Sequence, residues 1–163
     1  MSSLVEIRRN DTSFDNVYSR EKLSNSDGKH RIKKRVRMIR GIGTDIVEIA
    51  RIRKLIEKYG DHFLDKVYTA DEIALCSRKA LPPIHYAGRW AAKEAFYKAL
   101  CDEWQVLSSW KSIQVLTDSA SGRPFVEVLD TKLNEKFLAE RIEKVHLSIS
   151  HEKTMCTAVV ILE

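Results

Sequence analysis

The spacing of apolar and polar residues divides this chain into two parts that meet near Met38. Residues 1–37 are polar, rich in Ser, Asn, Asp and Arg, and lack a sustained period, which predicts a mostly disordered N-terminal extension. Residues 38–163 alternate between stretches of period two and stretches of helical period, without internal repeats. This pattern predicts one α+β domain, with a mixed or antiparallel sheet packed around a long central helix.

Five segments alternate as β-strands do. The first is 39–47. The next two, 111–117 and 124–129, flank a turn with the sequence SASGRP. The last two, 144–151 and 155–162, are joined by a tight link and therefore predict a hairpin. His151 ends the apolar face of the fourth segment, where a hydrogen-bonded structural histidine is the common explanation.

Two glycines and a carboxylate stand out in the first strand. Gly41 and Gly43 weaken a strand, and such glycines often mark close approach by a ligand or another backbone. Asp45 shares a face with Gly43 and Val47, although Asp is disfavoured in strands and costly to bury without a partner. Local sequence leaves two interpretations open: Asp45 caps the following helix, or it has a functional role.

Three further segments have helical spacing. Residues 48–59 predict an amphipathic helix that ends at Gly60. Its apolar stripe consists of Ile49, Ile52, Ile56 and Tyr59. Its basic stripe consists of Arg51, Lys54 and Lys58. The sequence TADE at 69–72 predicts a capping box and a short helix to about Arg78. Asp130 or Thr131 is expected to cap a helix to about Ile142. Its buried face is expected to contain Leu133, Phe137 and Leu138.

The segment His85–Leu100 has helix length and composition, and it follows two prolines that favour a helix start. Helical spacing brings Glu94, Lys98 and three alanines, at 87, 91 and 95, to one side. Small side chains let another element approach closely, whereas a core-facing stripe would normally carry Leu or Ile. Taken alone, the pattern also fits a surface ion pair between Glu94 and Lys98.

The positive charge of the chain is concentrated near its N-terminus. Residues 1–40 carry 11 Lys and Arg against 5 Asp and Glu, a balance of +6, whereas the remaining residues carry 17 against 18. The basic run 29–37 could contact nucleic acid or an acidic partner, but such runs are more often solvated tails. Nucleic acid is therefore not the expected partner.

Composition argues against several other classes of protein. The longest aliphatic run, Ala158–Leu162, is too short to cross a membrane, and no secretory signal is evident near the N-terminus. Cys76, Cys101 and Cys156 are widely spaced and odd in number, so they suggest neither a disulfide framework nor a zinc site. A reducing, cytoplasmic location is therefore expected.

Three stretches, taken in order, resemble the holo-[acyl-carrier-protein] synthase family, the small 4′-phosphopantetheinyl transferases. They are GIGTDIVEIARI at 41–52, GRWAAKEAFYKAL at 88–100 and LSISHE at 147–152. Each motif alone is of modest specificity, but the three together at these separations are specific. The resemblance extends from about Ile39 to Glu163 and implies that family's fold. Because members typically begin just before the first motif, it also favours Met38 as the effective start.

The resemblance implies an enzyme that moves phosphopantetheine from coenzyme A to a serine of apo acyl carrier protein and releases adenosine 3′,5′-bisphosphate. In that family Mg²⁺ is held by a strand Asp and by the Glu of the KEA motif, which here are Asp45 and Glu94. Lys98, Arg89 and His151 become candidates for binding the coenzyme A phosphates, and Lys98 and His151 are also counted as catalytic. The base that takes the serine proton stays open between Glu94, a metal-bound water and His151.

The resemblance also implies protein partners. Carrier proteins are acidic, and the family presents the helix after its first strand to the carrier. The basic stripe of Arg51, Lys54 and Lys58 is therefore expected to bind the carrier, with Arg51 as the main contact. The family's active sites usually lie between neighbouring subunits of a trimer, so a homotrimer is expected as well. No membrane partner is expected.

One segment departs from the family pattern. After the central helix the family generally continues Gly-Thr-Gly, whereas this chain has Cys101-Asp102-Glu103, which would bring negative charge toward a polyanion. Two alternatives to the transferase follow. One is a catalytically altered relative that binds an acidic partner through its basic tail. The other is a magnesium-dependent phosphohydrolase, which would use the same carboxylates but would not need the basic stripe.

Overall fold

The computed structural model describes residues 20–21, 33–34, 38–100 and 109–163, which fall into two compact units. In the unit of residues 9–38, β1 (Arg20–Glu21) pairs antiparallel with β2 (Lys33–Lys34). The described helices and the other strands belong to the second unit, which contains Ile39–Glu163. The departure at Cys101–Glu103 lies outside the described residues.

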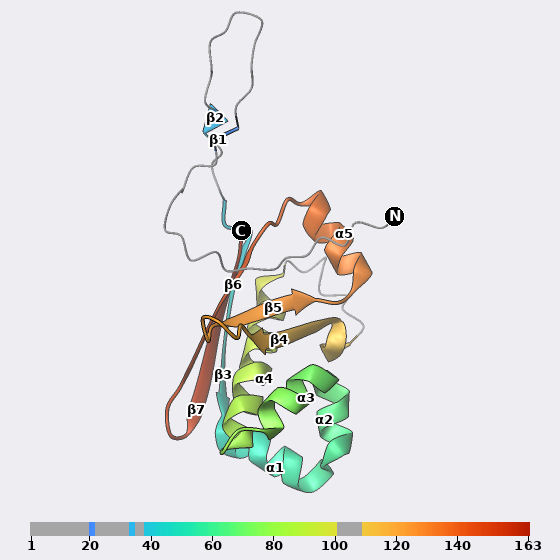
Figure 1. The fold of residues 1–163 in the computed structure, drawn as a ribbon, viewed down its shortest axis with the longest axis vertical. Helices are drawn as coiled ribbons and strands as arrows, with labels where there is room; N and C mark the ends of the chain where they lie inside the picture. The colour runs from blue at the N-terminus through green and yellow to red at the C-terminus, as the bar shows by residue number, and fades with distance from the viewer. Residues whose placement is uncertain (1–19, 22–32, 35–37, 101–108) are drawn as a thin grey trace, which may run out of the picture. The chain divides into compact units, whose positions relative to one another are not determined.

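The strands of the domain form two antiparallel groups (Figure 1). β3 (Gly41–Glu48) and β6 (Val145–His151) flank β7 (Met155–Leu162) in a three-stranded sheet. β4 (Ile113–Thr117) pairs with β5 (Pro124–Val128) in a separate ladder. The predicted hairpin is therefore confirmed, and so is the predicted α+β class with an antiparallel sheet.

The helices follow the predicted order, with two additions. They are α1 (Ile49–Tyr59), α2 (Asp61–Val67), α3 (Ala70–Ser77), α4 (Pro82–Ala99), the 3₁₀ turn η2 (Trp110–Ser112) and α5 (Thr131–Ala139). The longest, α4, runs beside the three-stranded sheet through the middle of the domain (Figure 1). None of the described helices is long and apolar enough to cross a membrane. The short α2 and η2 were not predicted, and η2 takes the first two residues of the strand predicted at 111–117.

Local sequence signals explain where three of these helices begin. Thr69 and Glu72 form the predicted capping box of α3, in which the Thr69 hydroxyl accepts from the Glu72 amide and the Glu72 carboxylate accepts from the Thr69 amide. Prolines occupy the first two positions of α4, where their missing amide hydrogen costs least. Asp130 caps α5 by accepting from the Leu133 amide at 2.9 Å.

β3 and α4 pack backbone against backbone. A Cβ atom on Gly41 would overlap the carbonyl oxygen of Ala99, and a Cβ atom on Gly43 would overlap that of Ala95. The expectation that these glycines mark a close approach is confirmed, and the approaching element is the alanine side of α4. This contact sets the position of the next inward-facing residue of the strand, Asp45.

The three-stranded sheet has one face that is buried in the core and one face, called the open face, that carries exposed apolar side chains. Val160 and Leu162 on β7 are fully buried against the core, together with Val47 on β3. On the opposite face, Ile42 and Ile46 of β3 are 57% and 64% exposed, so two large aliphatic side chains stand in solvent on either side of Thr44. Such a patch commonly marks an interaction surface.

Two predicted core positions are wrong. Leu138 was expected in the core but is 57% exposed, and Tyr59 is 47% exposed. Only one side of α5 contacts the rest of the domain, through Leu133 and Phe137, and one residue further along a helix rotates the side chain by about 100°. The helix also stops at Ala139, three residues before the predicted end, and Ile142 is buried after the chain has left the helix.

Candidate active site

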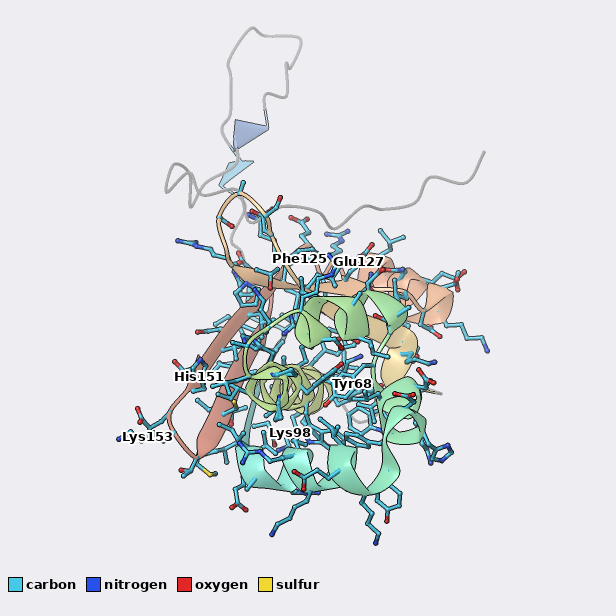
Figure 2. All side chains as sticks on the ribbon, turned by 60° about the horizontal axis from the view of Figure 1, so that its bottom comes forward. Tyr68, Lys98, Phe125, Glu127, His151 and Lys153 are labelled. Carbon is cyan, nitrogen blue, oxygen red and sulfur yellow. The ribbon has the colours of Figure 1, made fainter. Side chains whose placement is uncertain are left out.

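The first feature of the site is an ion pair between strand and helix. The Lys98 ammonium on α4 lies 2.7 Å from Oδ1 of Asp45 on β3, and the Thr157 hydroxyl donates to the Asp45 carbonyl at 2.9 Å. The Asp45 side chain is 13% exposed and that of Lys98 is 52% exposed, so the pair lies at an opening to solvent. Figure 2 shows Lys98 between α4 and α1.

This pair decides between the interpretations of Asp45. The N-cap of α1 is Glu48, and no side-chain hydrogen bond caps it, so the helix-cap interpretation of Asp45 is wrong. Lys98 forms its ion pair across to β3 with Asp45, rather than the surface pair with Glu94 that helical spacing allowed. The contact between β3 and α4 therefore creates the environment of Asp45.

Glu94, one turn before Lys98, belongs to the same electrostatic cluster. Burial raises the pKa of its carboxyl group, and the nearby charge of Asp45 raises it further, whereas Lys98 and Arg51 act in the opposite direction. The hydrogen bond to Asp45 raises the pKa of Lys98, which keeps its ammonium charged at neutral pH. Two carboxylates and two cations thus meet where β3, α1 and α4 come together.

The two carboxylates fit a magnesium ion that also binds substrate. Magnesium prefers oxygen ligands and is commonly held by one or two carboxylates together with water and substrate phosphates. Within residues 38–100 and 109–163, no three His, Cys, Asp or Glu side chains gather as a ligand set. Asp45 and Glu94 therefore suit an ion whose remaining ligands are water and a substrate phosphate, rather than a structural metal ion bound entirely by protein side chains.

Arg89 and His151 belong to a separate, basic cluster around His85, which also includes Lys79. His151 is exposed at the end of β6 (Figure 2), whereas Arg89 on α4 is buried. Arg89 donates through Nη1 to the His85 carbonyl at 3.2 Å and through Nη2 to the Thr117 hydroxyl at 3.5 Å. Its Nε atom is buried and has no hydrogen-bond partner among the described residues. A free buried donor of this kind suits an anion, and the phosphate roles of Arg89 and His151 remain predictions.

His85 adds a histidine that sequence reasoning missed. It lies one turn before Arg89 on α4 and is partly buried. Burial lowers its pKa, and the charges of Arg89, Lys79 and His151 lower it further. His85 therefore stays neutral at neutral pH within a basic surrounding. The helical pattern around His85 gave no indication that this side chain would lie near His151, which is remote in sequence.

The predicted carrier-binding residues lie along α1, which packs against α4. Arg51, Lys54 and Lys58 are exposed, and the Lys58 ammonium lies 5.0 Å from the centre of the Tyr59 ring. The charge of Arg51 acts on Glu94, so the start of the basic stripe adjoins the carboxylate cluster. The stripe and the candidate site therefore form one continuous surface at Arg51.

Sequence reasoning also missed a buried ion pair behind the site. Lys93, next to Glu94 in the KEA motif, is fully buried, and its ammonium lies 2.9 Å from Oε2 of Glu72, which is also fully buried. Burial lowers the pKa of Lys93, and the charge of Glu72 opposes this shift. The capping box pointed to Glu72 as a helix start, but not to this second role.

Comparisons with known proteins show the family of the chain. Residues 41–158 match the family model of the 4′-phosphopantetheinyl transferase superfamily. Holo-[acyl-carrier-protein] synthase of Protochlamydia amoebophila is 41% identical over 121 residues, which covers 74% of this chain and 95% of that protein. The crystal structure of holo-[acyl-carrier-protein] synthase from Neisseria meningitidis superposes with a TM-score of 0.69 at 34% identity, covering 77% of this chain and 99% of that one.

A further structure contains a bound coenzyme. Holo-[acyl-carrier-protein] synthase from Helicobacter pylori in complex with coenzyme A superposes with a TM-score of 0.60 at 30% identity, over 75% of this chain and 99% of that one. The chain therefore belongs to the 4′-phosphopantetheinyl transferase superfamily. Within that superfamily it is similar to the holo-[acyl-carrier-protein] synthases, which confirms the resemblance seen in the three motifs.

Proposed function

We propose that this chain is a magnesium-dependent holo-[acyl-carrier-protein] synthase. A serine oxygen of the apo carrier attacks the phosphorus that bears the pantetheine arm of coenzyme A. The bond from that phosphorus to the bridging oxygen breaks, and adenosine 3′,5′-bisphosphate leaves. The observation that carries the proposal is the meeting of Asp45, Glu94 and Lys98 in a chain that matches this family along its domain.

Three basic side chains are proposed to bind the coenzyme A phosphates. Lys98 supplies a cation at the carboxylate cluster, and its ion pair with Asp45 holds that cation in place. Arg89 offers a buried Nε donor that has no hydrogen-bond partner within residues 38–100 and 109–163, and His151 is exposed and acts, like Arg89, on His85. Charge-assisted hydrogen bonds to phosphate are strong and directional, so these groups orient the coenzyme as well as attract it.

Asp45 and Glu94 are proposed to hold the magnesium ion. When bound, the ion would neutralise negative charge that develops on the phosphate oxygens during transfer. The two carboxylates would hold the ion, and the Lys98 ammonium lies 2.7 Å from Oδ1 of Asp45. The proton of the attacking serine passes to a base, which stays open between Glu94, a metal-bound water and His151.

The basic stripe on α1 is proposed to bind the acidic acyl carrier protein. Arg51 is exposed and acts electrostatically on Glu94, so a carrier bound there would bring its serine to the carboxylate cluster. Lys54 and Lys58 extend the same positive surface away from the site. Complementary charge of this kind speeds encounter and selects acidic partners.

A homotrimer is part of the proposal. The exposed aliphatic side chains of Ile42 and Ile46 support it, because they lie on the open face of the sheet rather than in the core of the chain. In the family, neighbouring subunits share each active site. A cytoplasmic location is proposed as well, and the free thiols of Cys76 and Cys156 support a reducing compartment.

Intact mass spectrometry of an apo acyl carrier protein tests this function directly. The carrier is incubated with the purified chain, coenzyme A and magnesium, and its mass is expected to rise by one phosphopantetheine group. A chelator is expected to abolish the gain, and excess magnesium to restore it. No gain with several carriers, under conditions in which a known synthase modifies them, would overturn the proposal.

A further inference from the structure

The buried pair of Lys93 and Glu72 connects four segments. The Lys93 ammonium donates to the carbonyl oxygens of Trp110 at 2.8 Å and Ile113 at 2.9 Å, in addition to its contact with Glu72. The second carboxylate oxygen of Glu72 accepts from the Val115 amide at 2.9 Å. The pair therefore ties α3 and α4 to η2 and to the beginning of β4.

Stability alone is a weak reason for such a pair. Removing two charges from water costs several kcal/mol, and well-packed apolar residues of the same volume often stabilise a fold equally well. A buried pair with every contact satisfied instead defines one arrangement of the groups around it, because any shift leaves a buried charge without a partner. The question is which arrangement Lys93 and Glu72 define.

The segment that Lys93 holds carries an aromatic side chain against α4. The ring of Trp110 stacks on Trp90, with centroids 5.3 Å apart, and meets the edge of Tyr97 at 5.0 Å. The Tyr97 hydroxyl donates to the carbonyl of Ser109, next to Trp110, at 2.8 Å. Trp90 and Tyr97 are both therefore fixed from one side by the segment 109–113.

Trp90 and Tyr97 flank Glu94 on the surface of α4. Trp90 lies four residues before Glu94 and Tyr97 three residues after it, which are the two spacings that make neighbours on a helix. The charge of Glu94 acts on the Tyr97 hydroxyl, in agreement with this placement. Both neighbours of the carboxylate thus belong to the assembly that Lys93 anchors.

We propose that Lys93 is a positioning residue for the transferase site. Paired with Glu72, it holds Trp110 in place, and Trp110 holds Trp90 and Tyr97 on either side of Glu94. The direction of the Glu94 carboxylate toward Asp45 is then set from behind the helix as well as from β3. This inference rests on the proposed function, and it adds to it a residue that touches neither substrate nor ion.

Two variants and a matched control test the inference. Lys93→Met removes the ammonium at nearly constant volume, and the double variant Lys93→Met/Glu72→Gln also removes the opposing charge, so that a folded protein is obtained even if the single variant is unstable. Leu133→Ala, in the buried face of α5, is a destabilising control of another kind, because it shortens a core side chain and leaves the hydrogen bonds of Lys93 and Glu72 in place. All are assayed well below their melting temperatures.

For both Lys93 variants, kcat is expected to fall between about 10-fold and 100-fold, because small misplacement of a reacting group is costly. The KM values for coenzyme A and carrier are expected to stay within about twofold, because no binding group is removed. The near-ultraviolet circular dichroism of the stacked tryptophans is expected to weaken. Leu133→Ala is expected to keep kcat within about twofold of the wild-type value.

Tyr97→Phe tests the next link, since it removes only the hydroxyl that binds Ser109. It is expected to lower kcat by a few fold, and in combination with Lys93→Met to add little, because both act along one set of contacts. A Lys93→Met enzyme with normal kcat, or one no worse than Leu133→Ala, would overturn the inference while leaving the proposed function intact. Absence of transfer by the wild-type chain would overturn both.

Discussion

The ammonium group of Lys98 lies 2.7 Å from the carboxylate of Asp45, although 53 residues separate them in the chain. This contact exists because Gly41 and Gly43 let β3 approach the alanine side of α4 without intervening side chains. The third member of the cluster, Glu94, stands one turn before Lys98 on the same helix. Substitutions at these positions separate catalysis from folding.

Asp45→Asn and Glu94→Gln are each expected to lower kcat at least about 100-fold, because each removes a carboxylate that would help to neutralise developing charge. Titration calorimetry is expected to show weaker magnesium binding in the presence of coenzyme A. Circular dichroism is expected to be unchanged. Glu135→Gln, which neutralises an exposed carboxylate on α5, serves as the control and should have wild-type activity. Normal turnover by Asp45→Asn would contradict the metal assignment.

Gly43→Ala is expected to destabilise the domain by about 1–3 kcal/mol or more, because its Cβ atom would overlap the Ala95 carbonyl oxygen and push β3 from α4. Urea unfolding measures this loss. The neighbouring residue Thr44 is exposed on the open face, so Thr44→Ala should change the free energy of unfolding by less than about 0.5 kcal/mol. Equal stability of the two variants would show that the strand and helix are further apart than described.

Arg51→Glu is expected to raise the KM for acyl carrier protein at least about tenfold, with a smaller change in the KM for coenzyme A, because it reverses charge in the proposed docking stripe. Steady-state kinetics with each substrate varied in turn measures both constants. Arg53→Glu makes the same charge change at an exposed position on another side of α1 and is the matched control. If the two variants behave alike, net charge rather than the stripe governs carrier binding.

The buried thiols predict a loss of stability at high pH. Burial raises the pKa of Cys76 and of Cys156 from 9.0 to about 11. A raised thiol pKa means that the folded state retains protons that the unfolded state releases, so this contribution is complete below pH 9.0 and is lost as pH rises toward about 11. Urea unfolding between pH 8 and pH 11 should show a fall that is smaller in Cys76→Ala/Cys156→Ala. A fall of equal size in the wild-type chain and in the double variant would show that the two thiols do not cause this loss of stability.

The open face of the sheet predicts how the chain assembles. Ile42→Glu is expected to convert the proposed trimer to monomers, because it would bury a carboxylate at an apolar interface. Analytical ultracentrifugation measures the oligomeric state. Leu138→Glu is a closely matched control, since Leu138 and Ile42 are each 57% exposed but lie on different surfaces. A monomeric wild-type chain, or a trimer unaffected by Ile42→Glu, would exclude this face as the trimer interface.

The local structure and the candidate residues of the site could be read from the sequence. Alternation and helical spacing located the strands and most of the helices, because burial on one face leaves a period in the chain. The capping box at Thr69 and the prolines at the start of α4 act on the first turn of their own helix. Their effects could therefore be predicted without knowing which elements pack nearby. The three motifs also identified the family, and they named Asp45, Glu94 and Lys98 as candidates for its site.

Which partner each polar group has depends on how the elements pack. The tertiary structure paired Asp45 with Lys98, buried Lys93 against Glu72, enclosed Arg89 and left Leu138 in solvent. None of these outcomes has a local signal, because each depends on which element packs against which side of a helix. Residues remote in sequence meet only after the chain has folded, and charge, burial and pKa at the site follow from that meeting.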